Sequence, residues 1–172
     1  RGAAMAGEIA NSIFKPFFIG RDPLYREKHW HEYRTADRWW NHAPIYSYGP
    51  FDINCWLLSS MKAEQPLYKY LGAYRDSVPI YGSSLVLKTP DAYAKEALEY
   101  KNRGFNAYKL HPPGDYDFDL EAHKAVRKAV GDDFKLMSDP VAPYTFEQAL
   151  RFGRELEKLN YYWYEEPLFD EN

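Results

Sequence analysis

The sequence predicts an α/β fold of parallel strand–helix units that follows a helical N-terminal segment. Two observations lead to this prediction. From residue 77 onward, short apolar runs typical of strands alternate with longer helical patterns, whereas the pattern before that point is helical. Strands that alternate with helices are typical of βαβ units and a parallel sheet. We therefore divide the chain into residues 1–76 and residues 77–172.

Four helices are expected in the first segment. The first spans residues 5–15, where Pro16 should end it because proline lacks a backbone N–H. Two more have helical patterns at residues 24–38 and 51–63. The stretch QPLYKYLG predicts a short fourth helix, and its glycine, Gly72, is a typical helix end.

Four strands are expected in the second segment. They read VPIYGSS, NAYKLH, FKLMSD and YYWYEE, and they recur roughly every 28 residues. Two architectures fit such a repeat, an open doubly wound sheet and a closed barrel. No glycine-rich phosphate loop follows any of these runs, which argues against a nucleotide-binding open sheet.

A helix is expected after each of the first three strands. Thr89 should cap the first helix ahead of a proline, and the second should begin near Phe118. Thr145 and Gln148 fit a capping box at the start of the third. The inner face expected for this third helix consists of Phe146, Ala149, Leu150 and Gly153. On the second helix, His123 lies among charged residues, and we expect it to be solvated.

Composition excludes several classes of protein. The 172 residues carry a net charge of −3 with both signs mixed, so the chain has no basic surface suited to nucleic acid. No apolar run approaches the ~18 residues of a membrane span, and the N-terminus lacks the apolar core of a secretory signal. Cys55 is the only cysteine, which leaves no disulfide framework. We therefore expect a soluble cytoplasmic protein.

Ionisable residues stand at the ends of three predicted strands. Lys109 and His111 end the second strand, Asp139 ends the third and Glu165 ends the fourth. In a barrel these ends converge on one mouth, so the four side chains should lie close together. Two carboxylates from adjacent strands can share a hard divalent cation, and two basic groups beside it could handle a proton. This pattern indicates removal of the α-proton of a carboxylate substrate with magnesium, a chemistry that uses a Lys or His base.

These features together resemble the enolase superfamily, in its mandelate racemase and muconate-lactonizing branch. The motifs that carry the resemblance are GRDP, FDINCW, QPLYKYLG, YKLH, LMSDP and WYEEP. The resemblance implies a modified TIM-type (β/α) barrel preceded by the helical part of an α+β capping domain. Residues 1–76 would be the C-terminal helical part of that cap, and residues 77–172 the first four βα units of a truncated barrel. A third metal ligand and a second acid/base would then lie beyond Asn172.

The resemblance also implies a role for each strand-end residue. Asp139 and Glu165, 26 residues apart, resemble the first and second Mg²⁺ ligands. Lys109 matches the first lysine of the family's Lys-x-Lys motif. His111 stands in place of the second, the proton-abstracting one in the racemases. A histidine has an unperturbed pKa of about 6.5, so it can be a neutral base near pH 7 without a large shift.

The function that we favour from the sequence is that of a lyase, an acid-sugar dehydratase that acts on a small carboxylate, with Mg²⁺ as cofactor. A racemase, epimerase or cycloisomerase of the same branch is the alternative, and a non-catalytic barrel retained for assembly is a third. The preference for a dehydratase follows from analogy, because a His in the Lys-x-Lys motif is less expected of the racemases. We expect a homo-oligomer that binds neither nucleic acid nor membrane.

Overall fold

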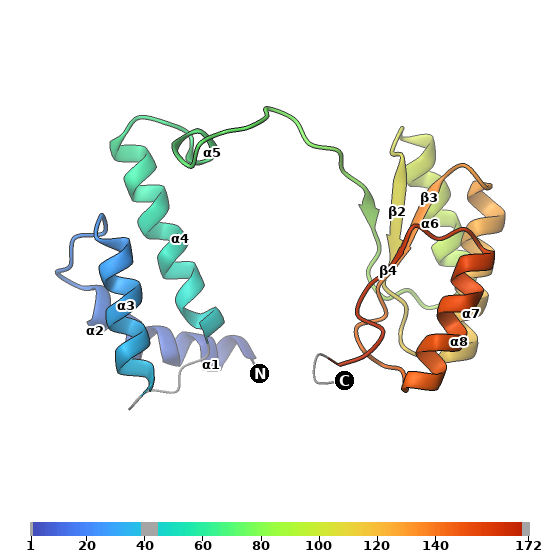
Figure 1. Ribbon diagram of the computed structural model, residues 1–172, viewed down its shortest axis with the longest axis horizontal. Coiled ribbons are helices and arrows are strands. Elements are labelled where there is room, and N and C mark those ends of the chain that lie inside the picture. Colours follow the sequence, from blue (N-terminus) through green and yellow to red (C-terminus); the bar gives the residue numbers. More distant parts are fainter. Residues whose placement is uncertain (1, 39–44, 170–172) are drawn as a thin grey trace. The chain divides into compact units, whose positions relative to one another are not determined.

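The structure is a computed structural model that describes residues 2–38 and 45–169. The chain forms two compact units, Arg1–Asp76 and Ser77–Asn172, each with its own hydrophobic core. Every element described in the first unit is a helix, and the second unit alternates strands with helices (Figure 1). Within the described residues, no helix is both long enough and apolar enough to cross a bilayer.

The first unit contains the four expected helical regions, with one correction. Its elements are α1 (Gly2–Ile9), the π-helix η1 (Ala10–Phe14), α2 (Lys15–Phe18), α3 (Arg26–Ala36), α4 (Ile45–Lys62) and α5 (Leu67–Tyr70). The expectation that Pro16 ends the first helix is wrong, because Pro16 lies in the first turn of α2 and helical residues continue to Phe18. The π-helical turn η1 directly precedes Lys15 and Pro16, and it lets the helical path continue through the proline.

Aromatic side chains form the core of the first unit. Phe14, Tyr33 and Tyr48 are buried at its centre. The rings of Phe18 and Phe51 pack against them, stacked on each other with centroids 5.3 Å apart. Such ring pairs contribute about 0.5–1.5 kcal/mol beyond the area that they bury. Through this cluster, η1 and α2 pack against α3 and α4.

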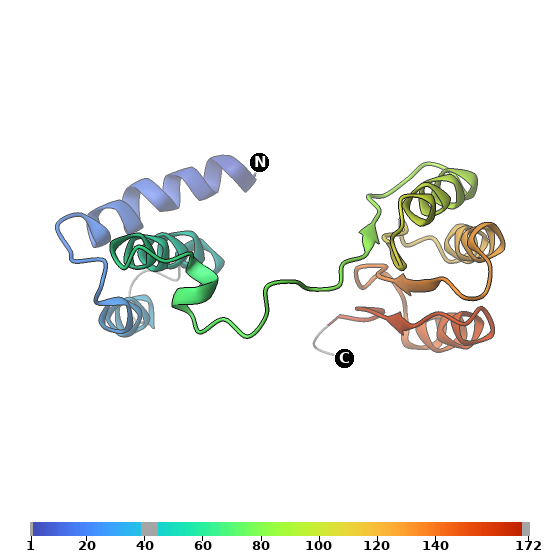
Figure 2. The ribbon, with the colours of Figure 1, turned by 90° about the horizontal axis from the view of Figure 1, so that it is seen from above.

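The second unit is built on four parallel strands, which confirms the predicted α/β class. The strands are β1 (Gly82–Ser83), β2 (Ala107–Leu110), β3 (Lys135–Ser138) and β4 (Trp163–Tyr164). They lie side by side in chain order, and each pair is parallel. The helices that connect them are α6 (Pro90–Asn102), α7 (Tyr116–Val130) and α8 (Phe146–Lys158). All three helices cover the same face of the sheet (Figure 2).

Each of these three helices begins at a side-chain cap. Thr89 and Asp115 accept backbone N–H hydrogen bonds in the first turns of α6 and α7. Thr145 and Gln148 form the expected capping box of α8, in which each side chain accepts from the backbone N–H of the other. A cap of this kind stabilises a helix by about 1 kcal/mol, so the local sequence fixes where each helix starts.

The inner face expected for α8 is partly wrong. Phe146 and Leu150 are 70% and 48% exposed, whereas Phe152 and Leu156 are buried together with Ala149. Both sets of residues fit a helical period and both include Ala149. The apolar pattern alone therefore cannot decide which set faces the sheet, and tertiary packing makes the choice.

The core of the second unit lies between the sheet and its helices. Its buried members are Tyr93, Ala97, Tyr108, Leu110, Ala122, Val126, Val130, Phe134 and Leu136. On β1, Gly82 is required by this packing, because a Cβ atom there would lie 2.5 Å from the ring of Tyr100. The close approach lets α6 lie against the edge of the sheet.

Arg127, near the end of α7, hydrogen-bonds to two connections, the one from α7 to β3 and the one from α8 to β4. Its guanidinium donates to the carbonyl oxygens of Leu159 and Asn160 at 2.7 Å each, directly after α8. It also donates to Gly131 at 2.6 Å and Phe134 at 2.8 Å, in the turn before β3. Four carbonyl groups that have no ladder partner are thereby satisfied by one buried side chain.

Asp119, earlier on α7, holds the loops that follow β2 and β3. Its side chain is fully buried, and Oδ2 accepts from the backbone N–H of Gly114 at 3.1 Å and from the hydroxyl of Tyr144. The two loops touch, since a Cβ at Gly114 would lie 2.7 Å from Pro143. Burial raises the pKa of Asp119 to about 6, and the bonds from Tyr144 and Gly114 oppose this only in part.

This raised pKa predicts a pH-dependent loss of stability that Asp119→Asn should remove. Between about pH 4 and pH 6 the unfolded carboxyl loses its proton while the folded one keeps it. The wild-type free energy of unfolding should therefore fall as pH rises through this window, by up to about 3 kcal/mol. Asparagine keeps an acceptor for Gly114 and Tyr144 but cannot ionise. Urea denaturation of both proteins should show that the variant gains stability relative to the wild type as pH rises through this window. A difference in unfolding free energy that does not change with pH would contradict a raised pKa of Asp119.

Candidate active site

The register of the strands places the ionisable residues on one face of the sheet. Lys109 on β2 pairs with Met137 on β3, which pairs with Trp163 on β4. Side chains two apart on a strand share a face, so the residues that follow this row by two lie on the same side. These are His111, Asp139 and Glu165. The ladder extends to them, since Asp139 N donates to Leu110 O at 2.9 Å and Glu165 N donates to Ser138 O at 2.8 Å.

All four residues singled out from the sequence meet at the carboxyl end of the sheet. The ammonium of Lys109 donates to Asp139 Oδ2 at 2.9 Å and to Glu165 Oε2 at 3.0 Å. His111 Nε2 lies 2.9 Å from the same oxygen of Asp139. Lys109 and Asp139 are buried, at 7% and 6% exposed, whereas Glu165 and His111 remain partly accessible. The site is thus closed to solvent around Lys109 and Asp139 and open to it around Glu165 and His111.

Lys109 carries a positive charge in this setting. Burial alone would lower the pKa of its ammonium, because it removes water from the charged form. Hydrogen bonds and charges from Asp139 and Glu165 outweigh that effect, so the pKa of Lys109 lies above its usual range. In this arrangement the two carboxylates therefore hold the lysine in its charged form.

The ring of His111 is oriented by β1. Its Nδ1 lies 2.7 Å from the carbonyl oxygen of Ser84, which can only accept, so Nδ1 carries a hydrogen. Nε2 is then the nitrogen that faces the site, where Asp139 Oδ2 can accept a hydrogen from it. The backbone of His111 is held as well. Its N–H donates to the hydroxyl of Ser84 at 2.9 Å, and its carbonyl oxygen accepts from the hydroxyl of Tyr93 at 2.8 Å.

Three residues of the site were not singled out from the sequence. Trp163 donates from its indole N–H to Glu165 Oε2 at 3.1 Å, and Ser84 and Tyr93 fix His111. The strand period could have found Trp163, which precedes Glu165 by two. Ser84 ends its predicted strand as the other site residues end theirs. Tyr93 lies on a helix, and nothing in its sequence context points to the site.

The carboxylates suit a hard divalent cation. Oδ1 of Asp139 is buried and has no hydrogen-bond partner, so an oxygen donor is available there. Asp139 and Glu165 both contact one nitrogen atom of Lys109, which keeps them close together. Magnesium is commonly held by one or two carboxylates together with water and substrate oxygens. In the part of the chain that the structure describes, no three His, Cys, Asp or Glu side chains form a group that could hold a metal ion.

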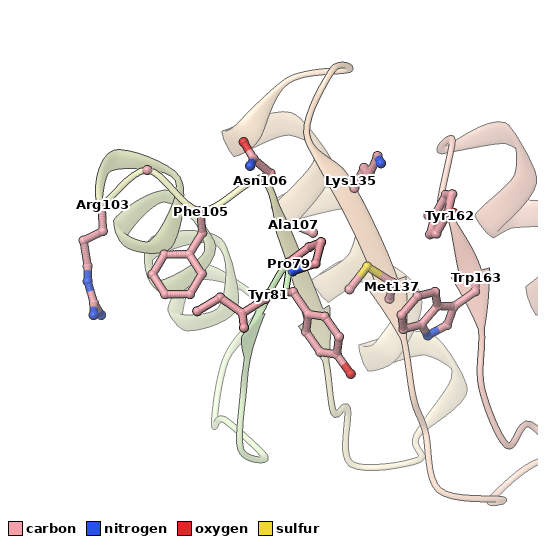
Figure 3. Close-up of a pocket in the computed structure, with 12 residues that line it drawn as sticks. Pro79, Tyr81, Arg103, Phe105, Asn106, Ala107, Lys135, Met137, Tyr162 and Trp163 are labelled. Carbon is pink, nitrogen blue, oxygen red and sulfur yellow. The ribbon is translucent and has the colours of Figure 1, made fainter. Parts of the chain in front are cut away.

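An apolar hollow lies on the same face, nearer the amino ends of the strands (Figure 3). It has a volume of about 330 Å³, and its lining includes Tyr81, Met137 and Trp163. The rings of Tyr81 and Trp163 meet edge to face with centroids 5.7 Å apart. No carboxylate lines this hollow, whereas Asp139 and Glu165 lie at the carboxyl end of the sheet.

The sequence also matches a known protein family. The sequence model of the enolase C-terminal domain-like family matches residues 92–172. The L-talarate/galactarate dehydratase of Salmonella typhimurium is 34% identical over 174 residues, which cover 96% of this chain and 42% of that protein. The chain therefore spans less than half the length of this relative.

Solved structures share the fold. The D-glucarate dehydratase from Agrobacterium tumefaciens, crystallised with magnesium, matches with a TM-score of 0.86 and 34% identity, over 96% of this chain and 47% of that one. The dipeptide epimerase from Enterococcus faecalis, complexed with magnesium and L-Leu-L-Tyr, matches with a TM-score of 0.84 and 29% identity, over 98% and 46%. Of the two architectures left open by the sequence, these matches support the barrel.

The matched relatives are acid-sugar dehydratases, epimerases and cycloisomerases. Their family accounts for the order of the motifs, the parallel strands of the second unit and the ionisable residues at the strand ends. The chain belongs to the enolase superfamily, in its mandelate racemase and muconate-lactonizing branch.

Proposed function

We propose that this protein removes the α-proton of a carboxylate substrate with the help of Mg²⁺, and that the overall reaction is the dehydration of a sugar acid. The observation that carries the proposal is the contact of one buried ammonium, Lys109, with both Asp139 and Glu165, beside His111. In this proposal residues 1–76 are the helical part of a capping domain, and residues 77–172 are the first four βα units of the barrel.

Asp139 and Glu165 would hold the metal. Their oxygens are hard donors, and Oδ1 of Asp139 has no partner within the protein. When bound, Mg²⁺ would stabilise the negative charge that develops on the substrate carboxylate as the α-proton leaves. Trp163, which donates to Glu165, would keep that carboxylate turned toward the site.

Lys109 would bind the substrate carboxylate and stabilise the charge of the enediolate. Its ammonium stays charged and lies in a buried position, where a fixed cation acts on nearby negative charge more strongly than in water. Because it contacts the ground-state carboxylate as well, it would contribute to substrate affinity and to turnover.

His111 would take the α-proton at Nε2. The Ser84 carbonyl keeps a hydrogen on Nδ1, so the proton would be exchanged at Nε2. Nε2 contacts Asp139 Oδ2, and it would present its lone pair to the substrate once Asp139 binds the metal instead. Once this nitrogen has taken the proton, Asp139 Oδ2, 2.9 Å away, would stabilise the imidazolium. The ring is accessible enough to reach a bound substrate, since 27% of its side chain is exposed.

The alternatives within the branch share this first step. In a dehydration the enediolate expels its β-hydroxyl, which would take a proton from an acid group such as the protonated His111 and leave as water. A racemase or epimerase instead returns a proton to the α-carbon from the other face. Dehydration is favoured here by relatives that are 34% and 32% identical, which are dehydratases of sugar acids. A non-catalytic barrel is disfavoured, because burying Lys109 with its carboxylates costs desolvation free energy that an apolar replacement would avoid.

His111→Asn should abolish exchange of the substrate α-hydrogen with deuterated solvent. Asparagine keeps much of the shape of histidine but cannot act as a base, and a general base typically accounts for about 10²–10⁴-fold in rate. The intact protein would first be screened against sugar acids, galactarate and D-glucarate among them, and exchange would then be followed by NMR. Mg²⁺ binding should be unchanged. Near wild-type exchange and turnover in the variant would remove His111 from the role of base.

Lys109→Met should weaken both substrate affinity and turnover, because it removes a charge that acts in the ground state and in the transition state. Steady-state kinetics on the substrate from the same screen should show KM raised and kcat lowered. The contrast with His111→Asn is diagnostic, since that variant should lose turnover while it still binds substrate. A Lys109→Met protein that folds and retains wild-type kinetics would show that the ammonium is structural.

A further inference from the structure

A fully buried histidine lies directly behind the candidate site, on the helix side of the sheet. His123 on α7 is 0% exposed, so the expectation that it is solvated is wrong. Its ring lies 5.1 Å from the ring of Phe152 and 5.0 Å from the ring of Tyr161, measured between centroids. The proposed reaction does not use this imidazole, and a polar ring in such a position requires partners for both nitrogens.

Both nitrogens of His123 have partners, and these fix its tautomer. Nδ1 lies 2.5 Å from the backbone carbonyl oxygen of Asp119, which can only accept, so Nδ1 carries the hydrogen. Burial lowers the pKa of His123 to about 4, which keeps the ring neutral. Nε2 is therefore an acceptor, and the hydroxyl of Ser138, 2.8 Å away, donates to it.

Ser138 is connected through its backbone to the backbones of both Asp139 and Glu165. It directly precedes Asp139 in the chain, and its carbonyl oxygen accepts the hydrogen bond from Glu165 N at 2.8 Å. Its side chain is fully buried and contacts α7 through His123, whereas Asp139 lies on the opposite face of β3. On the helix side of the sheet, the Ser138 hydroxyl thus bonds the end of β3 to α7 through His123.

We propose that His123 is a positioning residue for the two carboxylates: by accepting the Ser138 hydroxyl it fixes the backbone from which Asp139 and Glu165 reach the metal. The proposal rests on the proposed function of that site. Magnesium demands near-octahedral geometry, so a small displacement of either carboxylate weakens its binding. Residues that orient metal ligands from outside the coordination shell typically account for 10–100-fold in metal affinity.

The test is the affinity of the intact protein for Mg²⁺, measured by isothermal titration calorimetry alongside the melting temperature. Ser138→Ala removes the donor and leaves His123 in place, and His123→Leu removes the acceptor. Each should weaken Mg²⁺ binding about 10–100-fold. The double variant should bind Mg²⁺ no more weakly than the single variant with the lower affinity, because both changes break the same bond.

Tyr161→Phe is the matched control. It removes a hydroxyl that donates to the carbonyl oxygen of His123 at 3.1 Å, yet it leaves the bond between His123 and Ser138 intact. It should lower the melting temperature without changing the Mg²⁺ affinity. A role of His123 in stability alone predicts instead that affinity changes in step with melting temperature in all the variants.

Two outcomes would overturn the inference, and one of them also removes the proposed site. If Asp139→Asn abolishes Mg²⁺ binding but Ser138→Ala binds as the wild type does, the site stands and the positioning role fails. If Asp139→Asn leaves Mg²⁺ binding unchanged, the metal site itself is misplaced and the positioning role falls with it. Should His123→Leu fail to fold, Ser138→Ala decides the question, because it removes only one oxygen atom.

Discussion

The arrangement of the candidate site depends on one buried cation. Lys109 lies beneath the carboxyl end of the sheet and contacts Asp139 and Glu165, so side chains from the ends of three strands are held by one nitrogen atom. A buried ammonium is tolerated only where negative partners offset its desolvation. This requirement fixes the register of the strands, because a slip of one residue on any of them would turn its ionisable side chain to the apolar helix face.

Helix α7 supports this arrangement with a row of buried polar residues. Asp119, His123 and Arg127 are spaced four apart, so they lie on one side of the helix. Asp119 holds the loops after β2 and β3, His123 holds the end of β3 and Arg127 holds the ends of α7 and α8. An apolar helix could supply the core on this side, but it could not satisfy the backbone N–H of Gly114 or the four carbonyl groups that Arg127 binds.

The parallel strands, the helices between them and the four strand-end residues could be predicted because short-range rules determine them. Strand alternation places Lys109 beside His111, and parallel strands bring Asp139 and Glu165 to the same edge. Other features depend on long-range packing that no local pattern reports. His123 looks like a surface residue among its charged neighbours, yet its partner is Ser138 on another element.

Similar limits apply to the helices. The capping box at Thr145 is a local signal and was predicted correctly, whereas the buried face of α8 depends on which apolar set meets the sheet. Pro16 is a strong local signal for a helix end, but a π-helical turn just before it lets the helical path continue. Tyr93, which fixes His111 from α6, has no local signal at all.

In the proposed function, Asp139 and Glu165 are ligands of one metal ion. A crystal structure of the intact protein grown with Mg²⁺, and with Mn²⁺ for its anomalous signal, would locate that ion. We expect a single ion with one oxygen of each carboxylate at ~2.0–2.1 Å in the Mg²⁺ form. An ion bound elsewhere, with Asp139 and Glu165 still paired to Lys109 at saturating Mg²⁺, would contradict it.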